Sequence, residues 1–470
     1  MVLARRLVYV GLFLLPLLHY RVGKAFDLSD LCFLVAAGFL ILSRRPPVKA
    51  PPAPGWYFGA FVFVLAGVVA SSQAVSKTAS LQVVFNAIFV FFVLQWMLRQ
   101  LLDSTVRIQT GMIAFVLGSS VSAFVAFLQT EFHVLGYSHQ ASLEGARAVG
   151  LSNQPNIAAV AFALALVFAI GLVVELGLRR AWYLGVCIAV LASALIFSAS
   201  VSGMSSTLVG CFVLFITRGF RLRTIIGVAA ALTVVYVVAI SVQSSGSHFS
   251  LNPIARIEQT TGTNTGYNTV NPRVATLEHS WSGIVESPII GHGLDQATIA
   301  VYYDADVGVY YPAHNIIILY WFAGGIFMVA AGAIMMGSSC NRLLHGRRQR
   351  RRANARESAI RDTVLAGCVV VLFFSMQSPE LVDRWLWSPF ILALCFRDRA
   401  AAAVAAPPER AGAGLPEPVP ALQPASPFPR PARAASSDPA PVLRRVSGTV
   451  PPRPAPTTSP ETAAGGGCPW

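Results

Sequence analysis

The chain has 470 residues, of which 55% are hydrophobic and only 12% charged, and its mean hydropathy is +0.61. Soluble globular chains carry about 25% charged residues, so this composition excludes an ordinary soluble protein. Apolar runs long enough for a bilayer recur through the first 400 positions, which is the pattern of a multispanning membrane protein. The seven cysteines have neither paired nor metal-like spacing, which argues against a disulfide framework and a zinc site.

The apolar runs predict twelve membrane-spanning segments, which must be helical because only helices and closed barrels pair every backbone group in lipid. They lie near 7–22, 28–42, 56–75, 80–98, 108–130, 156–177, 181–199, 203–217, 222–242, 314–337, 361–378 and 385–396. The first is kept as a span rather than a signal peptide, since no small-residue cleavage site follows it. The expected fold is an all-α polytopic membrane protein of about twelve transmembrane helices, with one long outer loop that contains short helices.

The distribution of Lys and Arg orients the chain. With the N-terminus inside, the inner loops and span ends carry twenty of these residues and the outer loops seven. This asymmetry is the positive-inside signal of membrane proteins, and it accounts for the net charge of +14 without any nucleic-acid partner. The basic run at 342–356 is interpreted as a topology anchor that touches anionic lipid.

Three regions follow from this organisation: a transmembrane domain at 1–399, the large outer loop at 243–313 within it, and a tail at 400–470. The tail is rich in Pro and Ala and lacks apolar periodicity, so we expect it to be disordered and cytoplasmic. Long loops inside folded domains are usually functional or disordered. The loop at 243–313 contains a helical pattern, which favours a function.

The helical pattern in this loop follows Asn271 and Pro272, which are placed as the cap and the first helical residue. The apolar positions share one face at helical spacing: Leu277, Trp281, Ile284 and Val285. We expect this helix to lie on the membrane surface or on the other spans. Arg273 falls in its first turn, where a cation opposes the helix dipole unless an anionic ligand binds there too. Contact with lipid headgroups is an equally weighted interpretation of Arg273.

Two further polar positions belong to the outer face. His314 and Asn315 open the span near 314–337, and a helix N-terminus favours the neutral form of histidine, which suits a base or a hydrogen-bond acceptor. A histidine at the lipid interface is the alternative. Arg147 precedes a polar stretch that caps the span near 156–177, so we expect a second cation on this side of the membrane.

Three stretches together carry a family resemblance: RAVGLSNQPNIAA at 147–159, PRVATLEHSWSGIVESPIIGHG at 272–293, and AHNIIILYWFAGG at 313–325. With twelve spans and a long loop before a late span, this order resembles the O-antigen ligase and polysaccharide polymerase family. The architectural likeness covers about 1–396, whereas the three motif stretches together hold 48 residues.

The resemblance implies a metal-independent glycosyltransferase without a cofactor, which moves a glycan from undecaprenyl pyrophosphate to an acceptor. It implies an O-antigen ligase-like enzyme of the bacterial inner membrane, with a periplasmic active face and lipid A–core as acceptor. A polymerase, whose acceptor is another glycan chain, is the alternative. The implied partners are the lipid-linked donor, the acceptor and membrane lipids. The implied site comprises His314 as base, Arg273, Arg147 and Arg256 on the pyrophosphate, and Asn315, Asn156, Gly291 and Gly293 in support.

The chain departs from the family at one point. Many members carry Ser-Arg-Gly at the outer end of a mid-chain span, where this chain reads SASVSGMSS, with Val201 and Met204. Arg147 or Arg256 is expected to supply the missing charge. Asp304 and Asp306 have the spacing of a metal-binding pair, but no further ligand stands beside them, so we expect them to be solvated.

Two other classes of protein remain as alternatives. Twelve spans are also typical of a polysaccharide transporter or flippase, but the two halves of this chain show no repeat. The other class is a non-catalytic assembly protein, in which the arginines and the histidine would not need to lie close together.

Overall fold

The computed structural model describes 1–17, 21–22, 26–43, 53–132, 147–152, 154–219, 270–304, 309–345, 347, 354–378 and 383–396. All of them belong to the unit Met1–Pro407. The predicted span near 222–242, Arg256, Asp306 and the tail at 400–470 lie outside the described residues.

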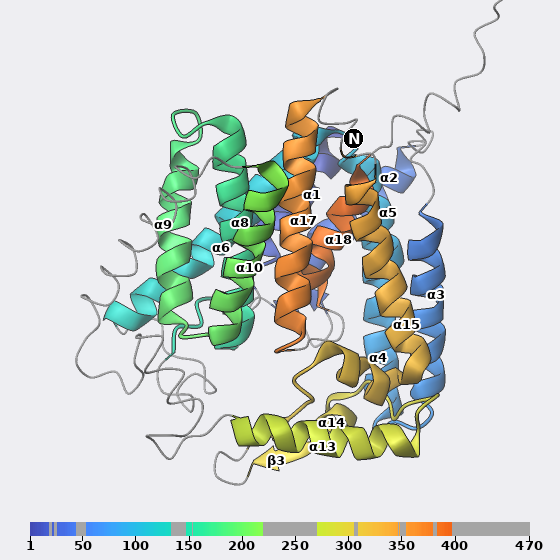
Figure 1. The fold of residues 1–470 in the computed structure, drawn as a ribbon. Coiled ribbons are helices and arrows are strands. Elements are labelled where there is room, and N and C mark those ends of the chain that lie inside the picture. Colours follow the sequence, from blue (N-terminus) through green and yellow to red (C-terminus); the bar gives the residue numbers. More distant parts are fainter. Residues whose placement is uncertain are drawn as a thin grey trace, which may run out of the picture. The chain divides into compact units, whose positions relative to one another are not determined.

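The described part consists almost entirely of helices (Figure 1). The first are α1 (Val2–Leu14), α2 (Leu28–Leu42), α3 (Pro54–Ala70), α4 (Lys77–Ile88), the π-helix η1 (Phe89–Leu94), α5 (Gln95–Leu101) and α6 (Thr105–Phe132). The others are α8 (Pro155–Leu176), α9 (Trp182–Phe197), α10 (Val201–Arg218), α13 (Val270–Glu286), α14 (Gln296–Ile299), α15 (Ile316–Leu344), α17 (Ala355–Ser375) and α18 (Arg384–Cys395). The mostly helical fold agrees with the all-α expectation, and the described part adds two short antiparallel hairpins: β1 (Arg21–Val22) with β2 (Phe26–Asp27), and β3 (Tyr302–Asp304) with β4 (Val309–Tyr311).

Six of the described helices are long and apolar enough to cross a membrane: Lys77–Leu101, Thr105–Gln129, Pro155–Leu176, Val201–Arg218, Ile316–Leu344 and Ala355–Ser375. Helices α2, α3 and α9 are apolar but shorter. The count of twelve spans therefore stays a prediction. Helix α1 starts at Val2 and includes Arg5 and Arg6, so it begins before the first predicted span near 7–22, which itself stays a prediction. Arginine is a good helix former, and its long side chain reaches water from a buried helix end.

Helix α8 lies among α6, α9, α10 and α17. Its side chains are mostly apolar, with many alanines among them, and most are buried. Gly171 of α8 faces Thr363 of α17, and Gly210 of α10 faces Val370 of α17, so these helices approach where an added Cβ would overlap a neighbour. Small residues at such contacts let helix backbones come close in a membrane.

The π-helix η1 interrupts the span formed by α4 and α5. Its wider turn displaces the regular backbone pairing, and the indole Nε1 of Trp56 donates to the Phe91 carbonyl at 2.9 Å. The rings of Trp56, Phe91 and Trp387 meet edge to face, with centroids 4.7–6.0 Å apart. This aromatic cluster ties α3 and η1 to α18.

Helix α15 is broken at Gly324 and Gly325, where φ reaches −133° and +70°. The segment that follows α13 fills the break: the His292 N–H donates to the Phe322 carbonyl at 2.9 Å, and the Ile326 N–H donates to the Pro288 carbonyl at 3.0 Å. A Cβ at Gly325 would overlap the Ile289 carbonyl, so only glycine fits here. Discontinuous helices are also a feature of transporters, but here these backbone groups are paired by the chain itself.

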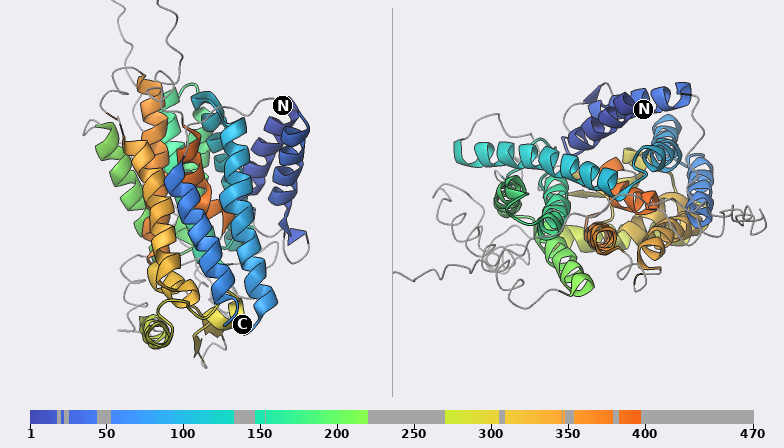
Figure 2. Two further views of the ribbon diagram at one scale, coloured as in Figure 1. Left: turned by 90° about the vertical axis from the view of Figure 1, so that its right-hand side faces the viewer. Right: turned by 90° about the horizontal axis from the view of Figure 1, so that it is seen from above.

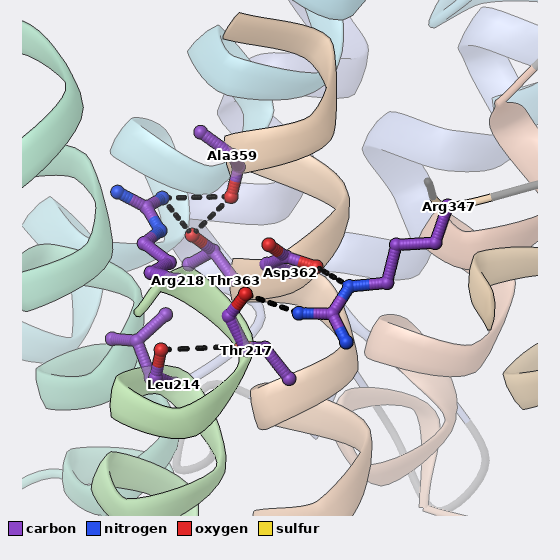
Figure 3. A network of polar contacts seen from close by, with 7 residues as sticks. All are labelled: Leu214, Thr217, Arg218, Arg347, Ala359, Asp362 and Thr363. Carbon is purple, nitrogen blue, oxygen red and sulfur yellow. Dashed lines mark hydrogen bonds and ion pairs between the residues drawn. The ribbon is translucent and has the colours of Figure 1, made fainter. Parts of the chain in front are cut away.

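At the end of the bundle that holds the N-terminus, arginines tie α10 to α17 (Figure 3). Arg218 donates to the Ala359 carbonyl at 2.7 Å and to the Thr363 hydroxyl at 2.6 Å. Arg347 pairs with Asp362 at 3.1 Å and also donates to the Thr217 carbonyl. The basic run at 342–356 is thus more than a lipid-facing anchor, because Arg347 binds protein groups.

Candidate functional site

Arg273 is the fourth residue of α13, so it lies beside the backbone N–H groups at the start of that helix. The helix starts at Val270, one residue before the predicted cap at Asn271. The Arg273 side chain keeps exposed surface, yet the protein around it removes enough water to lower the pKa of its guanidinium. The Arg273 guanidinium therefore lies at the surface of the protein and is only partly desolvated.

His314 lies directly before the break-containing helix α15. Asn315 caps that helix, since its side-chain oxygen accepts from the N–H groups of Ile317 at 2.9 Å and Ile318 at 3.3 Å. The supporting role expected for Asn315 thus has a physical basis: the cap fixes the backbone that carries His314.

The imidazole of His314 is held in its neutral form. Burial, the larger cause, and the positive charge of Arg273 together lower the pKa of His314 from 6.5 to about 4, while a backbone hydrogen bond with Pro312 acts in the opposite direction. Among the described residues, the buried Nδ1 of this ring has no hydrogen-bond partner. A neutral imidazole with an unused nitrogen is able to accept a proton or a hydrogen bond.

The segment between these two residues anchors them to the bundle. Asp295 caps α14 by accepting from Thr298, and the Thr298 hydroxyl in turn accepts from the Val75 N–H at 3.0 Å. The N–H of Leu294 donates to the Ser80 hydroxyl at 2.9 Å. The hairpin of β3 and β4 then leads the chain to His314, and the Tyr302 ring touches that of His279 on α13.

Gly291 and Gly293 serve packing in this structure. Their φ angles are +80° and +115°, and a Cβ at either would overlap Ala323 or Ala74 respectively. The N–H of Gly293 donates to the Ala323 carbonyl at 2.9 Å. The Pro-x-x-Gly-x-Gly motif is therefore the element that enters the break of α15, and its contribution to the site is to position α13.

Arg147 is buried and tightly held where α8, α9 and α10 meet. Its Nε donates to the Ser198 carbonyl at 2.8 Å, and a second nitrogen donates to Asn156 Oδ1 at 3.0 Å. Asn156 also accepts from the Ser200 hydroxyl at 2.9 Å. The guanidinium of Arg147 thus lies against SASVSG, the stretch that lacks the arginine of the family motif.

Sequence reasoning missed Gln129, which holds the Arg147 segment on α6. Its side-chain amide pairs with both backbone groups of Gly150, at 2.9 and 3.0 Å. Gly150 has a φ of +60°, which places its N–H and carbonyl toward this amide. A glutamine inside the apolar run 108–130 was the available signal, since polar groups in spans usually have a partner.

The predicted site residues thus fall into two groups within the described part of the chain. Arg273 and His314 interact electrostatically. Arg147 and Asn156 form their own cluster at the ends of α8 and α10, which lie at the same end of the bundle as α13 (Figure 1). Arg256 lies outside the described residues.

These features define a multi-pass membrane protein that carries arginines and a neutral histidine at one end of its helical bundle. A family model described as O-antigen ligase matches residues 186–332, from α9 into α15. This match supports the resemblance to the O-antigen ligase and polysaccharide polymerase family over the part of the chain that it covers. No curated protein matches the chain significantly.

Proposed function

We propose that this enzyme transfers a glycan from undecaprenyl pyrophosphate to a hydroxyl of lipid A–core, as an O-antigen ligase of the inner membrane with a periplasmic active face. The observation that carries the proposal is the His314 ring, whose buried Nδ1 has no hydrogen-bond partner among the described residues and whose pKa is lowered by burial and by the charge of Arg273. It associates a cation suited to a pyrophosphate with a neutral imidazole suited to an incoming hydroxyl.

The proposed reaction needs little more than these two groups. The bond from the acceptor oxygen to the anomeric carbon forms while the bond from that carbon to the pyrophosphate oxygen breaks. The hydroxyl proton passes to His314, and undecaprenyl pyrophosphate leaves with its developing charge stabilised by Arg273. A polyprenyl pyrophosphate is already an activated leaving group, so we propose that no metal is required.

We further propose that donor binding prepares His314 as a base. An imidazole with this pKa is neutral at working pH but a weak proton acceptor. Bound pyrophosphate brings negative charge that offsets Arg273, and this raises the pKa of His314 toward the working pH. Donor binding therefore strengthens the base at the moment when it is needed.

We assign to Arg147 the second cation of the site. Its guanidinium is held against Ser198 and Asn156 at the start of α10, where relatives with Ser-Arg-Gly carry their arginine. Arg256 remains a further candidate for the same role. In this proposal Asn156 is a positioning residue, because it acts on the ligand only through Arg147.

Deleting the gene and separating the surface polysaccharides on a gel tests the proposal. A ligase predicts that polymer disappears from lipid A–core while lipid-linked polymer accumulates. Single repeat units on lipid A–core would assign the protein as a polymerase instead. Accumulation of donor on the cytoplasmic side would indicate a flippase and contradict the proposal.

A further inference from the structure

Helix α13 has three distinct faces rather than the two of an ordinary amphipathic helix. Thr276, Ser280 and Gly283 form a buried face of small side chains. A Cβ at Gly283 would overlap the Phe322 ring of α15, so this face is seated directly on that helix. Ile284 joins the buried face, which separates it from the apolar positions with which the sequence had grouped it.

The second face is apolar and exposed, and we name it the apolar stripe. It consists of Val274, Leu277, Trp281 and Val285, which are 45% to 66% exposed. At 100° per residue these four positions fall within about 80° of each other around the helix. The third face is polar and exposed, and it consists of Glu278, His279, Ser282 and Glu286.

Helix α13 runs in a different direction from the spans. In Figure 1 it lies across the end of the bundle, and in the left view of Figure 2 it is seen end-on while α15 runs vertically. Its 17 residues extend about 25 Å. A helix at right angles to the spans runs parallel to the plane of the membrane that those spans would cross.

The apolar stripe continues into the outward surface of α15. The rings of Trp281 and Trp321 meet edge to face with centroids 6.0 Å apart, and the Trp321 Nε1 donates to the Pro288 carbonyl at 2.9 Å. Beyond Trp321, the exposed side chains of α15 include Ile326 and Phe327. Tryptophans mark the depth at which lipid headgroups meet acyl chains.

We infer that α13 is an in-plane membrane helix whose apolar stripe is immersed in the acyl chains of outer-leaflet phospholipid. Continuity with α15, itself a span, identifies the occupant as lipid, and the acidic polar face turns toward water. Interfacial helices combine such an apolar face with a polar one and bury the apolar face at the headgroup boundary. Part of the loop at 243–313 is thus a membrane element.

This placement bears on the site, in a consequence that rests on the proposed function. Arg273 lies in the first turn of α13, where its side chain keeps exposed surface, so the depth of the helix sets the depth of its guanidinium. A lipid-linked pyrophosphate lies at the headgroup level, because its polyprenyl chain stays in the hydrocarbon. The in-plane helix therefore holds Arg273 at the level where the donor's phosphates arrive.

A depth measurement tests the inference without using activity. The full chain, with its native cysteines replaced, is placed as single copies in nanodiscs of phosphatidylcholine that contain no polyprenyl lipid. Val285→Cys on the apolar stripe and Ser282→Cys on the polar face are matched variants, and each carries a nitroxide. We expect Val285 to be relaxed mainly by oxygen, which concentrates in acyl chains, and Ser282 mainly by a water-soluble nickel chelate.

Equal nickel relaxation at both positions would overturn the inference. Protection of Val285 from both reagents would also overturn it, because the stripe would then be covered by protein. If a labelled variant fails to fold, quenching of the tryptophan fluorescence by phospholipid brominated near the headgroup replaces it. Trp281→Phe should then remove a quenched component, and an unchanged quenched fraction would contradict the inference.

Discussion

The positive charge of Arg273 lowers the pKa of His314, although Arg273 lies in the first turn of α13 and His314 lies just before α15. Burial acts on the same ring in the same direction and is the larger cause. Arg273 thus supplies a cation, and His314 supplies a neutral ring whose buried Nδ1 has no hydrogen-bond partner among the described residues. Each of the two residues has a separable consequence in the proposed reaction.

Arg273→Lys should fail nearly as badly as Arg273→Ala. Lysine keeps the charge but lacks the planar fork that binds two phosphate oxygens at once. Charged hydrogen bonds contribute about 1.5–3 kcal/mol each, so we expect donor binding to weaken at least tenfold in both variants. Titration of the purified protein with donor measures this loss, and full affinity in Arg273→Lys would show that only the charge matters.

His314→Ala should lower turnover by about 10²–10⁴-fold, the usual contribution of a general base. Donor affinity should stay close to that of the unmodified enzyme, since the ring receives the acceptor proton and does not hold the phosphates. His314→Gln is the matched control, because it retains polarity without a basic nitrogen. Single-turnover rates with saturating donor measure the effect, and normal rates in His314→Gln would refute a proton-accepting role.

Removing the cation should raise the pKa of His314. In Arg273→Gln the ring loses a charge that disfavours its protonated form, so its pKa rises from about 4 but stays below 6.5, because burial remains. The histidine then titrates at higher pH than in the unmodified enzyme. Carbon-13 shifts of labelled histidine during an acid titration measure this directly, and a fall in the pKa would show that the two groups do not interact as described.

Gly325→Ala should destabilise the protein strongly. Its Cβ would overlap the Ile289 carbonyl, and a φ of +70° costs a non-glycine residue about 1–2 kcal/mol before any overlap. Gly337→Ala on the same helix is the control, because nothing lies within 4 Å of its Cβ and alanine favours a helix. Thermal unfolding in detergent should show a lower midpoint for Gly325→Ala alone, and equal midpoints would mean that the break is not required.

The sequence was sufficient to predict several of the long apolar helices. Apolar runs such as 156–177 and 203–217 predict α8 and α10 within a few residues, because a buried backbone must pair locally and a helix pairs it within the run. Asn315 caps α15 for the same local reason. The family motifs also indicated Arg273 and His314 by residue type and order.

Only the tertiary structure decided which groups meet. The contact of Arg147 with Ser198, the entry of the segment after α13 into the broken α15, and the division of α13 into three faces all join residues far apart in the chain. The pKa of His314 depends in the same way on burial by distant segments and on the charge of Arg273. Periodicity reports which side chains of one helix share a face, but the partner of that face is chosen by packing between helices, and this packing leaves no local pattern in the sequence.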